Sequence, residues 1–244
     1  MILLVDAGNT RAKWRLTGSD GASVKEGFDL ASMPSTLAQL GVDDAPQRVA
    51  VSSVGSDQAT NELDRLLQAY TSAPVYFHWP RATAGGLRNS YADVTRMGAD
   101  RWHAMVAAWR EFAGGVAVVD AGSAVTVDYI DSGGQHLGGF ILPGLAMMLR
   151  SLSGNTARVI FEPKEHVDTR PGTNTSDAVN HGCDWLISAL SSRIRQDCTG
   201  YGIDSVVVTG GDAWRWNRLG LNAVHRPGLV LDGLFWADRE MHKS

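Results

Sequence analysis

The sequence predicts an α/β protein made of two related halves, each with a mixed β-sheet flanked by helices. Two stretches carry this prediction, Met1 to Leu16 and Val116 to Ile130. Each begins with an apolar run that ends in Asp-Ala-Gly and continues with alternating polar and apolar residues, which is typical of a strand, a tight turn and a return strand. Because Asp6 and Asp120 lie nearly half the chain apart, each hairpin fits at the start of its own domain. We therefore expect domains at residues 1–114 and 115–244.

Composition limits the class of protein. The chain has 244 residues, of which 44% are hydrophobic and 20% charged, as in ordinary globular enzymes. A net charge of −4 without a basic cluster argues against a nucleic-acid partner. We expect no membrane partner, because no apolar run is long enough for a span, and the amino terminus has no features of a secretory signal.

The two cysteines are expected to be free. Cys183 and Cys198 both fall in a predicted helix, fifteen residues apart. A helix would separate them by about 22 Å, which is too far for a disulfide. Buried thiols of this kind indicate a reducing, cytoplasmic location.

The first hairpin has features of a phosphate-binding turn. Gly8 lets the backbone approach a ligand closely, Asn9 and Thr10 offer polar groups to phosphate oxygens, and Asp6 is placed to hold a hydrated divalent cation. An ordinary hairpin in which Asp6 caps a turn is the alternative. The second copy at Asp120 favours the phosphate interpretation, with a nucleotide held in a cleft between the two halves for phosphoryl transfer. Neither GxxxxGK[ST] nor GxGxxG occurs.

The remaining elements of the first half follow from apolar periodicity. Strands are predicted at residues 21–28, 48–54 and 75–79, with a short helix at 34–40 and a longer helix that Ser56 caps. Ser52 and Ser53, at the end of the second of these strands, could face the cleft, although simple turn chemistry is the favoured explanation.

Residues 81–95 have no periodicity and are predicted to form a long loop of the kind that binds ligands or covers sites. The loop leads into a helix that runs from about Met97 to Phe112, with Asp100 and Arg101 in its first turn. An arginine there opposes the helix dipole. It indicates an anionic partner, although a surface salt bridge explains it equally well.

The second half repeats this pattern. After the Val116 to Ile130 hairpin we expect a strand ending at Leu142, a helix starting at Pro143, and a long helix that Thr173 or Asn174 caps and that runs to about Arg195. A last core strand at residues 204–209 precedes Gly210 and Gly211, which either leave room for a base or ribose or make a structural turn. The final amphipathic helix, 229–241, is expected to pack on the second domain.

Several motifs together resemble those of the type III pantothenate kinases, members of the actin, hexokinase and Hsp70 superfamily of duplicated RNase H-like domains. They occur in the family's order over nearly the whole chain: DAGNTRAKW at 6–14, Tyr91 before GADRW at 98–102, DAGSAVTVD at 120–128, GGFILPGLAMMLRSL at 138–152, NTSDAVNHG at 174–182 and VVVTGGD at 206–212. The resemblance implies two actin-like ATPase domains and the phosphorylation of pantothenate by ATP, the first step of coenzyme A synthesis.

The resemblance also implies site residues. The residues that it assigns to the ATP phosphates are Asp6, Ala7, Gly8, Asn9, Thr10, Arg11, Ala12 and Lys13. In the same assignment, Asp6 holds Mg²⁺ and Ser123 contacts ATP. Ser123 stands where the family usually has Thr, which keeps the hydroxyl. Those for pantothenate are Tyr91, Gly98, Ala99, Asp100, Arg101 and Thr175. Within this set Asp100 is the general base, and Arg101 pairs the carboxylate of pantothenate. Asp120 holds a monovalent cation, K⁺ or NH₄⁺, and the family implies a homodimer.

Two other functions stay open from the sequence. A kinase of the same fold could act on another small alcohol, and a regulatory accessory protein would need no intact Asp100. The presence of Asp6, Asp100, Arg101 and Asp120 together favours catalysis, because phosphoryl transfer depends mostly on positioning and charge neutralisation.

Overall fold

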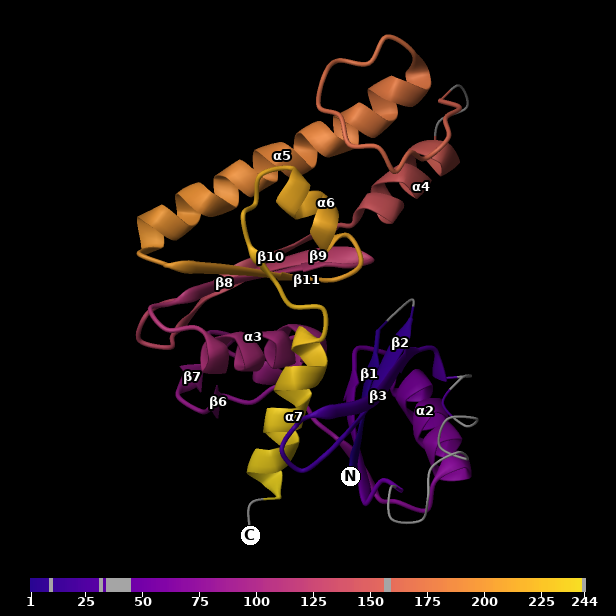
Figure 1. Cartoon of the computed structure of the whole chain (residues 1–244), viewed down its shortest axis with the longest axis vertical. Helices are drawn as coiled ribbons and strands as arrows, with labels where there is room; N and C mark the ends of the chain where they lie inside the picture. Colours follow the sequence, from indigo (N-terminus) through magenta and orange to yellow (C-terminus); the bar gives the residue numbers. More distant parts are fainter. Residues whose placement is uncertain (9–10, 31–32, 34–44, 156–158, 243–244) are drawn as a thin grey trace. The chain divides into compact units, whose positions relative to one another are not determined.

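The computed structural model describes residues 1–8, 11–30, 33, 45–155 and 159–242. The chain divides into two compact units, Met1–Arg110 with Gly228–Ser244, and Glu111–Pro227 (Figure 1). The expected ranges 1–114 and 115–244 differ from these units chiefly in the carboxyl-terminal segment. The predicted short helix at 34–40 lies outside the described residues, as do Asn9 and Thr10.

The first unit is built on a mixed five-stranded sheet, in the order β3-β2-β1-β4-β5. Its strands are β1 (Ile2–Ala7), β2 (Ala12–Thr17), β3 (Ser23–Phe28), β4 (Arg48–Ser53) and β5 (Val75–Phe77). The pairs β1–β2 and β2–β3 are antiparallel, whereas β1–β4 and β4–β5 are parallel. The carboxyl ends of β1 and β4 therefore meet at one edge of the sheet.

The second unit repeats this plan, with the strand order β10-β9-β8-β11-β12. Its strands are β8 (Val116–Ala121), β9 (Ala124–Ile130), β10 (His136–Pro143), β11 (Ser205–Thr209) and β12 (Val224–His225). Antiparallel and parallel pairs follow in the same sequence as in the first unit. The predicted duplication of a mixed sheet is confirmed.

Three helices belong mainly to the first unit: α2 (Asp57–Tyr70), α3 (Ala99–Glu111) and α7 (Leu229–Met241). The Ser56 hydroxyl accepts a hydrogen bond from the backbone N–H of Ala59 and caps α2, as predicted. Residues 81–95 are more ordered than a loop. They contain a two-stranded hairpin, β6 (Thr83–Ala84) and β7 (Leu87–Arg88), and the start of the short 3₁₀ helix η3 (Val94–Arg96). Strands of two residues are too short to produce a periodic pattern.

The predicted packing of the last helix on the second domain is wrong. Strand β1 is buried on both faces, so it needs a cover on each side. Leu63 and Leu67 of α2 cover one face. On the other face, Leu231, Leu234 and Phe235 of α7 pack against Ile2, Leu4 and Ala50. The ion pairs Arg15–Asp232 and Arg48–Asp238 hold α7 to the same sheet.

The second unit contains α4 (Leu145–Asn155), α5 (Thr175–Tyr201) and α6 (Ala213–Arg218). Helix α5 is longer than predicted and ends at Gly202, whose φ of +65° lies in the left-handed region. Cys183 and Cys198 both lie on α5, where they are buried and free, as expected. In the part of the chain that the structure describes, every helix is too short or too polar to cross a membrane.

Candidate functional site

The first candidate site lies where β1 ends. Asp6 stands opposite Lys13 of β2 on one side and opposite Ser52 of β4 on the other. Directly paired residues of neighbouring strands point to the same face of a sheet. The carboxylate of Asp6, the ammonium of Lys13 and the hydroxyl of Ser52 therefore share a face at the strand ends. The N–H of Gly8 donates to the carbonyl of Arg11 at 3.1 Å and closes the hairpin.

The first turn of α3 lies at the same end of this sheet. Ser52 Oγ is 3.0 Å from Nδ1 of His103, and both residues are fully buried. Asp100 precedes His103 by three residues, so both lie on one side of α3. The Ser52–His103 contact thus brings the helical turn that carries Asp100 to the strand end that carries Asp6.

Asp100 has a defined local environment. Its Oδ1 accepts a hydrogen bond from the backbone N–H of Arg101 at 2.7 Å. A Cβ added at Gly98 would lie 2.6 Å from the same oxygen, so this position accepts no larger residue without displacing the carboxylate. The carbonyl of Gly98 accepts from the N–H of Trp102 and starts the helix. Gly98 and Ala99 therefore shape the backbone on which Asp100 stands.

Arg101 is buried, with only 5% of its surface exposed, so the surface salt bridge considered for it is wrong. Its Nη1 donates a hydrogen bond to the Tyr91 hydroxyl at 2.9 Å, and its guanidinium lies 5.7 Å from the centre of that ring. A guanidinium is planar, and its fork of N–H donors matches the geometry of a carboxylate. This arrangement supports the anionic partner that the sequence indicated.

The loop that carries Tyr91 is held by hydrogen bonds within itself and by one from α3. The Asn89 carboxamide accepts from the N–H of Tyr91 at 3.0 Å, and the N–H of Asn89 donates to Ala82. At the other end, the indole of Trp109 donates to the carbonyl of Gly85 at 3.1 Å, in a turn where Gly85 and Gly86 both have positive φ. Tyr91 is thus held in place relative to Arg101.

The hairpin of the second unit places a carboxylate oxygen and a backbone carbonyl oxygen beside Gly210. Asp120 ends β8 in register with Thr209 of β11. A Cβ added at Gly210, whose φ is +92°, would lie 2.4 Å from the Ala121 carbonyl oxygen and 2.7 Å from Oδ1 of Asp120. Gly210 therefore makes a close structural contact with the hairpin, whereas Gly211 faces open space. The structural turn therefore accounts for Gly210, whereas a Cβ at Gly211 would meet no atom within 4 Å.

Ser123 and Thr175, the other two predicted site residues of the second unit, are both exposed. Ser123 lies in the turn of the β8–β9 hairpin, and its carbonyl accepts from the N–H of Gly144 at 3.2 Å. Thr175 is the first residue of α5, next to Asn174, whose side chain caps the helix through the N–H of Asp177. The described contacts do not bring Thr175 to the hairpin.

A family model described as type III pantothenate kinase matches residues 2–197. The chain belongs to the type III pantothenate kinase family. A type III pantothenate kinase of Marinobacter nauticus is 51% identical over 234 residues, which cover 96% of each chain.

Two solved structures have the same fold as this family member. A Campylobacter jejuni protein described as a Baf family transcriptional activator has 22% identity, a TM-score of 0.66 and 98% coverage of both chains. The inorganic polyphosphate/ATP-glucomannokinase of Arthrobacter sp. strain KM has 16% identity, a TM-score of 0.51 and 99% coverage of both chains. At these identities the likeness shows the fold alone, and it agrees with the predicted duplicated actin-like architecture.

The side chains of the candidate site fit a metal cation whose remaining ligands come from phosphate groups. Among the described residues, no group of three or more His, Cys, Asp or Glu side chains could bind a metal by themselves. Mg²⁺ in kinases usually has one or two carboxylate ligands, and phosphate oxygens and waters complete its shell. Asp6 is a carboxylate of this kind. Asp120 Oδ1 and the Ala121 carbonyl oxygen both lie against Gly210, and the Ala121 carbonyl accepts a hydrogen bond from the N–H of Asp212.

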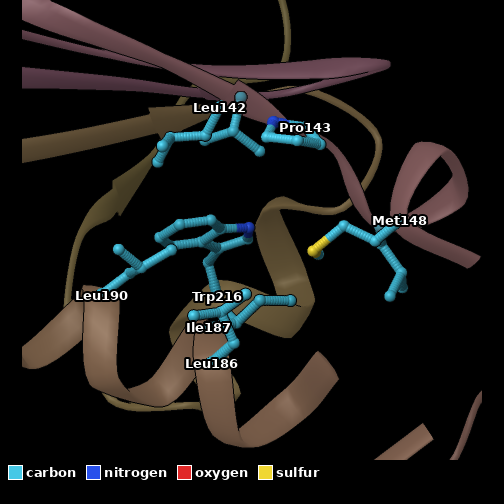
Figure 2. A pocket seen from close by; sticks show the side chains of 9 residues that line it. Leu142, Pro143, Met148, Leu186, Ile187, Leu190 and Trp216 are labelled. Atoms are coloured by element: carbon cyan, nitrogen blue, oxygen red, sulfur yellow. The ribbon is translucent and has the colours of Figure 1, made fainter. Parts of the chain in front are cut away.

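A cavity of about 110 Å³ in the second unit is a poor candidate for the nucleotide of a pantothenate kinase. Figure 2 shows the indole of Trp216 between Leu142 of β10 and Leu190 of α5, with Met148 of α4 beside it. Its lining is almost entirely apolar, and ligand sites are typically about 300–1,000 Å³ with a few polar groups.

The sequence analysis missed a buried polar cluster in the first unit. It contains His103, His78 and Asp238, with His78 Nε2 3.4 Å from Asp238 Oδ1, and Arg48 2.6 Å from the other oxygen. Burial, with a smaller effect of nearby His78, lowers the pKa of His103 to about 3, so this imidazole is neutral. Burial alone would raise the pKa of Asp238, but the nearby His78 imidazole and the hydrogen bond from Arg48 hold this pKa below its usual value.

A signal for His103 was present in the sequence. It lies three residues after Asp100 in a helix whose other buried residues, apart from Arg101, are apolar. The double serine at the end of β4, by contrast, resembled turn chemistry. That explanation holds for Ser53, whose hydroxyl accepts from the N–H of Gly55, and it is wrong for Ser52.

Proposed function

We propose that this protein transfers the γ-phosphoryl group of ATP to the primary hydroxyl of pantothenate, giving 4′-phosphopantothenate and ADP in the first step of coenzyme A synthesis. The Ser52–His103 contact is the observation that carries the proposal beyond family membership, because it brings the turn of Asp100 to the strand end of Asp6. A carboxylate near a cation-binding carboxylate is the arrangement that an alcohol kinase needs.

On the acceptor side, we assign the general base to Asp100 and the pantothenate carboxylate to Arg101. Asp100 accepts the proton of the attacking hydroxyl, and the N–H of Arg101 fixes its carboxylate. Tyr91 holds the guanidinium in the orientation that receives the substrate carboxylate through two parallel hydrogen bonds. Gly98 and Ala99 complete this surface with their backbone.

On the donor side of the first unit, we assign the ATP phosphates to the β1–β2 hairpin. Lys13 neutralises phosphate charge, and Asp6 holds Mg²⁺, which supplies charge neutralisation when bound. Gly8 and Arg11 form the closed turn. Ala7 and Ala12 pair directly and offer small side chains beside the phosphates. Asn9 and Thr10 complete this assignment from the family resemblance.

In the second unit, we assign a monovalent cation, K⁺ or NH₄⁺, to Asp120 and an ATP contact to Ser123. The cation assignment rests on the family resemblance and on the carboxylate of Asp120 in the second hairpin. Thr175 is assigned to pantothenate, and its exposed place at the start of α5 agrees with a contact supplied from another subunit.

We propose a homodimer in the cytoplasm. Large apolar side chains are exposed on β10, α4 and α5 of the second unit, and a surface of this kind is typical of subunit contacts. They are Phe140, Ile141, Met147, Leu152, Trp185 and Leu186. The two free, buried thiols agree with a reducing compartment. Light scattering coupled to size exclusion tests the dimer directly.

A coupled assay of ADP release tests the activity. We expect turnover with pantothenate that needs Mg²⁺ and rises with KCl or NH₄Cl in place of choline chloride. Asp100→Asn removes the proton acceptor and keeps the size of the side chain, so kcat should fall about 10²–10⁴-fold. Asp64→Asn on α2, whose side chain accepts a hydrogen bond from Gln68 in the same helix, is the matched control and should leave kcat unchanged.

Other outcomes separate the alternatives. Turnover with another small alcohol, but none with pantothenate, would identify a kinase of different specificity. ATP binding by calorimetry without turnover on any alcohol would point to the regulatory function. Undiminished turnover by Asp100→Asn would refute the assignment of the base.

A further inference from the structure

We propose that Ser52 and His103 are positioning residues for phosphoryl transfer. Their hydrogen bond fixes the first turn of α3, with Asp100, against the strand end that carries Asp6. The inference rests on the proposed function and names a contact that the roles assigned above do not include.

The contact joins strand β4 to helix α3. Ser52 Oγ and His103 Nδ1 are 3.0 Å apart, and the side chains are both 0% exposed, so no water competes for the bond. The imidazole is neutral because burial lowers its pKa to about 3. One of the two atoms therefore donates and the other accepts at any pH at which a kinase works.

The position of His103 on α3 is fixed from a second direction. A Cβ added at Gly233 of α7 would lie 1.8 Å from the backbone carbonyl oxygen of His103, so the two helices are in direct backbone contact here. The side chain of His103 meets β4 on one side, and its backbone meets α7 on the other. Residue 103 is thus the point at which α3 is held between the sheet and α7.

One buried atom of His103 lowers the stability of the fold. This cost is a reason to assign a function to the residue. Nε2 of His103 is buried without a hydrogen-bond partner among the described residues. Burying an unpaired polar nitrogen is unfavourable, and an apolar side chain would avoid this cost. A histidine at this place provides a directional bond to Ser52 that an apolar side chain cannot make.

A small movement of α3 at residue 103 would reach Asp100 directly. Three residues of helix span about 4.5 Å, less than one turn, so the segment moves as a rigid body. A general base acts within about 2.6–3.2 Å of the proton that it accepts, and a misplacement of about 1 Å can reduce the rate roughly 10²-fold. The Ser52–His103 bond limits such movement at the turn of the base.

Steady-state kinetics on matched variants test the inference. Ser52→Ala removes the hydroxyl, and His103→Leu removes the ring. We expect kcat to fall at least about tenfold in each, with KM for ATP within about twofold of wild type. The double variant should lose no more than the worse single variant, because both remove the same bond. His103→Asn has the shape of the Leu variant but keeps a polar group near the place of Nδ1, and it should restore part of kcat.

Ser53→Ala is the control on the same strand. The Ser53 hydroxyl contacts Gly55 and Thr60 instead of α3, so kcat should stay within about twofold of wild type. Thermal unfolding of every variant, with assays well below each midpoint, separates lost positioning from lost folding.

Each outcome has one meaning. Equal kcat for folded Ser52→Ala and wild type, or for the Asn and Leu variants at 103, would overturn the positioning role while the kinase activity stands. Absence of wild-type turnover with pantothenate would instead overturn the proposed function, and the inference with it. Amide exchange adds a readout besides activity: residues 99–104 should exchange faster in Ser52→Ala than in Ser53→Ala.

Discussion

Gly233 of α7 lies so close to His103 of α3 that a Cβ on the glycine would be 1.8 Å from the backbone carbonyl oxygen of the histidine. Real Cβ atoms do not approach this closely, so Gly233→Ala must push the two helices apart. We expect a loss of about 1–3 kcal/mol in the free energy of unfolding, measured by urea denaturation.

The matched control for this change is Gly182→Ala on α5. No atom lies within 4 Å of a Cβ built there, and the backbone is helical. Alanine should therefore stabilise the protein by up to about 1 kcal/mol through its higher helix propensity. A neutral effect of Gly233→Ala would contradict the close approach of α7 and α3.

Tyr91→Phe removes the hydroxyl that accepts from Arg101 while it keeps the ring. One hydrogen bond contributes about 1 kcal/mol, so we expect KM for pantothenate to rise roughly fivefold, with a smaller change in kcat. Initial rates over a range of pantothenate concentrations measure this. Tyr70→Phe on α2, a partly exposed tyrosine outside the site, should leave both constants unchanged. An unchanged KM in Tyr91→Phe would argue against the assignment of Arg101 to the carboxylate.

The buried imidazole of His103 should make stability depend on pH. Its pKa falls from 6.5 in the unfolded chain to about 3 in the fold, so the unfolded state binds more protons between these values. The neutral imidazole of His103 contributes fully to the free energy of unfolding above pH 6.5. This contribution is lost as the pH falls towards 3, by up to about 1.4 kcal/mol per pH unit. His103→Leu should flatten the curve of unfolding free energy against pH, and His166→Leu at an exposed position should not. Parallel curves for wild type and His103→Leu would refute the shift.

The buried pair Arg215–Asp184 should be worth more to stability than an exposed pair. Arg215 Nη1 meets Asp184 Oδ1 at 2.5 Å, and Nη2 donates to the carbonyls of Lys164 and Glu165. Arg215→Ala leaves a buried carboxylate without its guanidinium, so we expect a loss of about 3–5 kcal/mol by chemical denaturation. Arg193→Ala breaks an exposed pair with Asp197 on α5 and should cost less than about 1 kcal/mol. Similar losses for both would contradict this difference.

The two hairpins and the order of the main elements could be predicted because their signals are local. An apolar run that ends in Asp-Ala-Gly defines a strand and its turn within about fifteen residues, and Ser56 and Asn174 cap their helices through neighbours in sequence. The partner of α7 could not be predicted in this way. The apolar pattern of α7 is compatible with packing on either sheet. Which sheet it covers depends on strand β1, which is buried on both faces.

The candidate site likewise has features that could be predicted from the sequence and features that could not. The place of Asp100 in the first turn of α3 followed from the sequence. The burial of Arg101 and the contact of Ser52 with His103 did not, because the residues of that contact are 51 positions apart and meet only in the folded sheet. A double serine has no periodic signature, so nothing in the sequence pattern separated Ser52 from Ser53.

The place of α7 has a consequence for biosynthesis. During translation, strand β1 is made long before residues 231–235, whose side chains cover one of its faces. Until residues 231–235 have been made, the apolar side chains of Ile2 and Leu4 on this face are not covered by α7. Burial of both faces of β1 therefore cannot be complete until α7 has been synthesised.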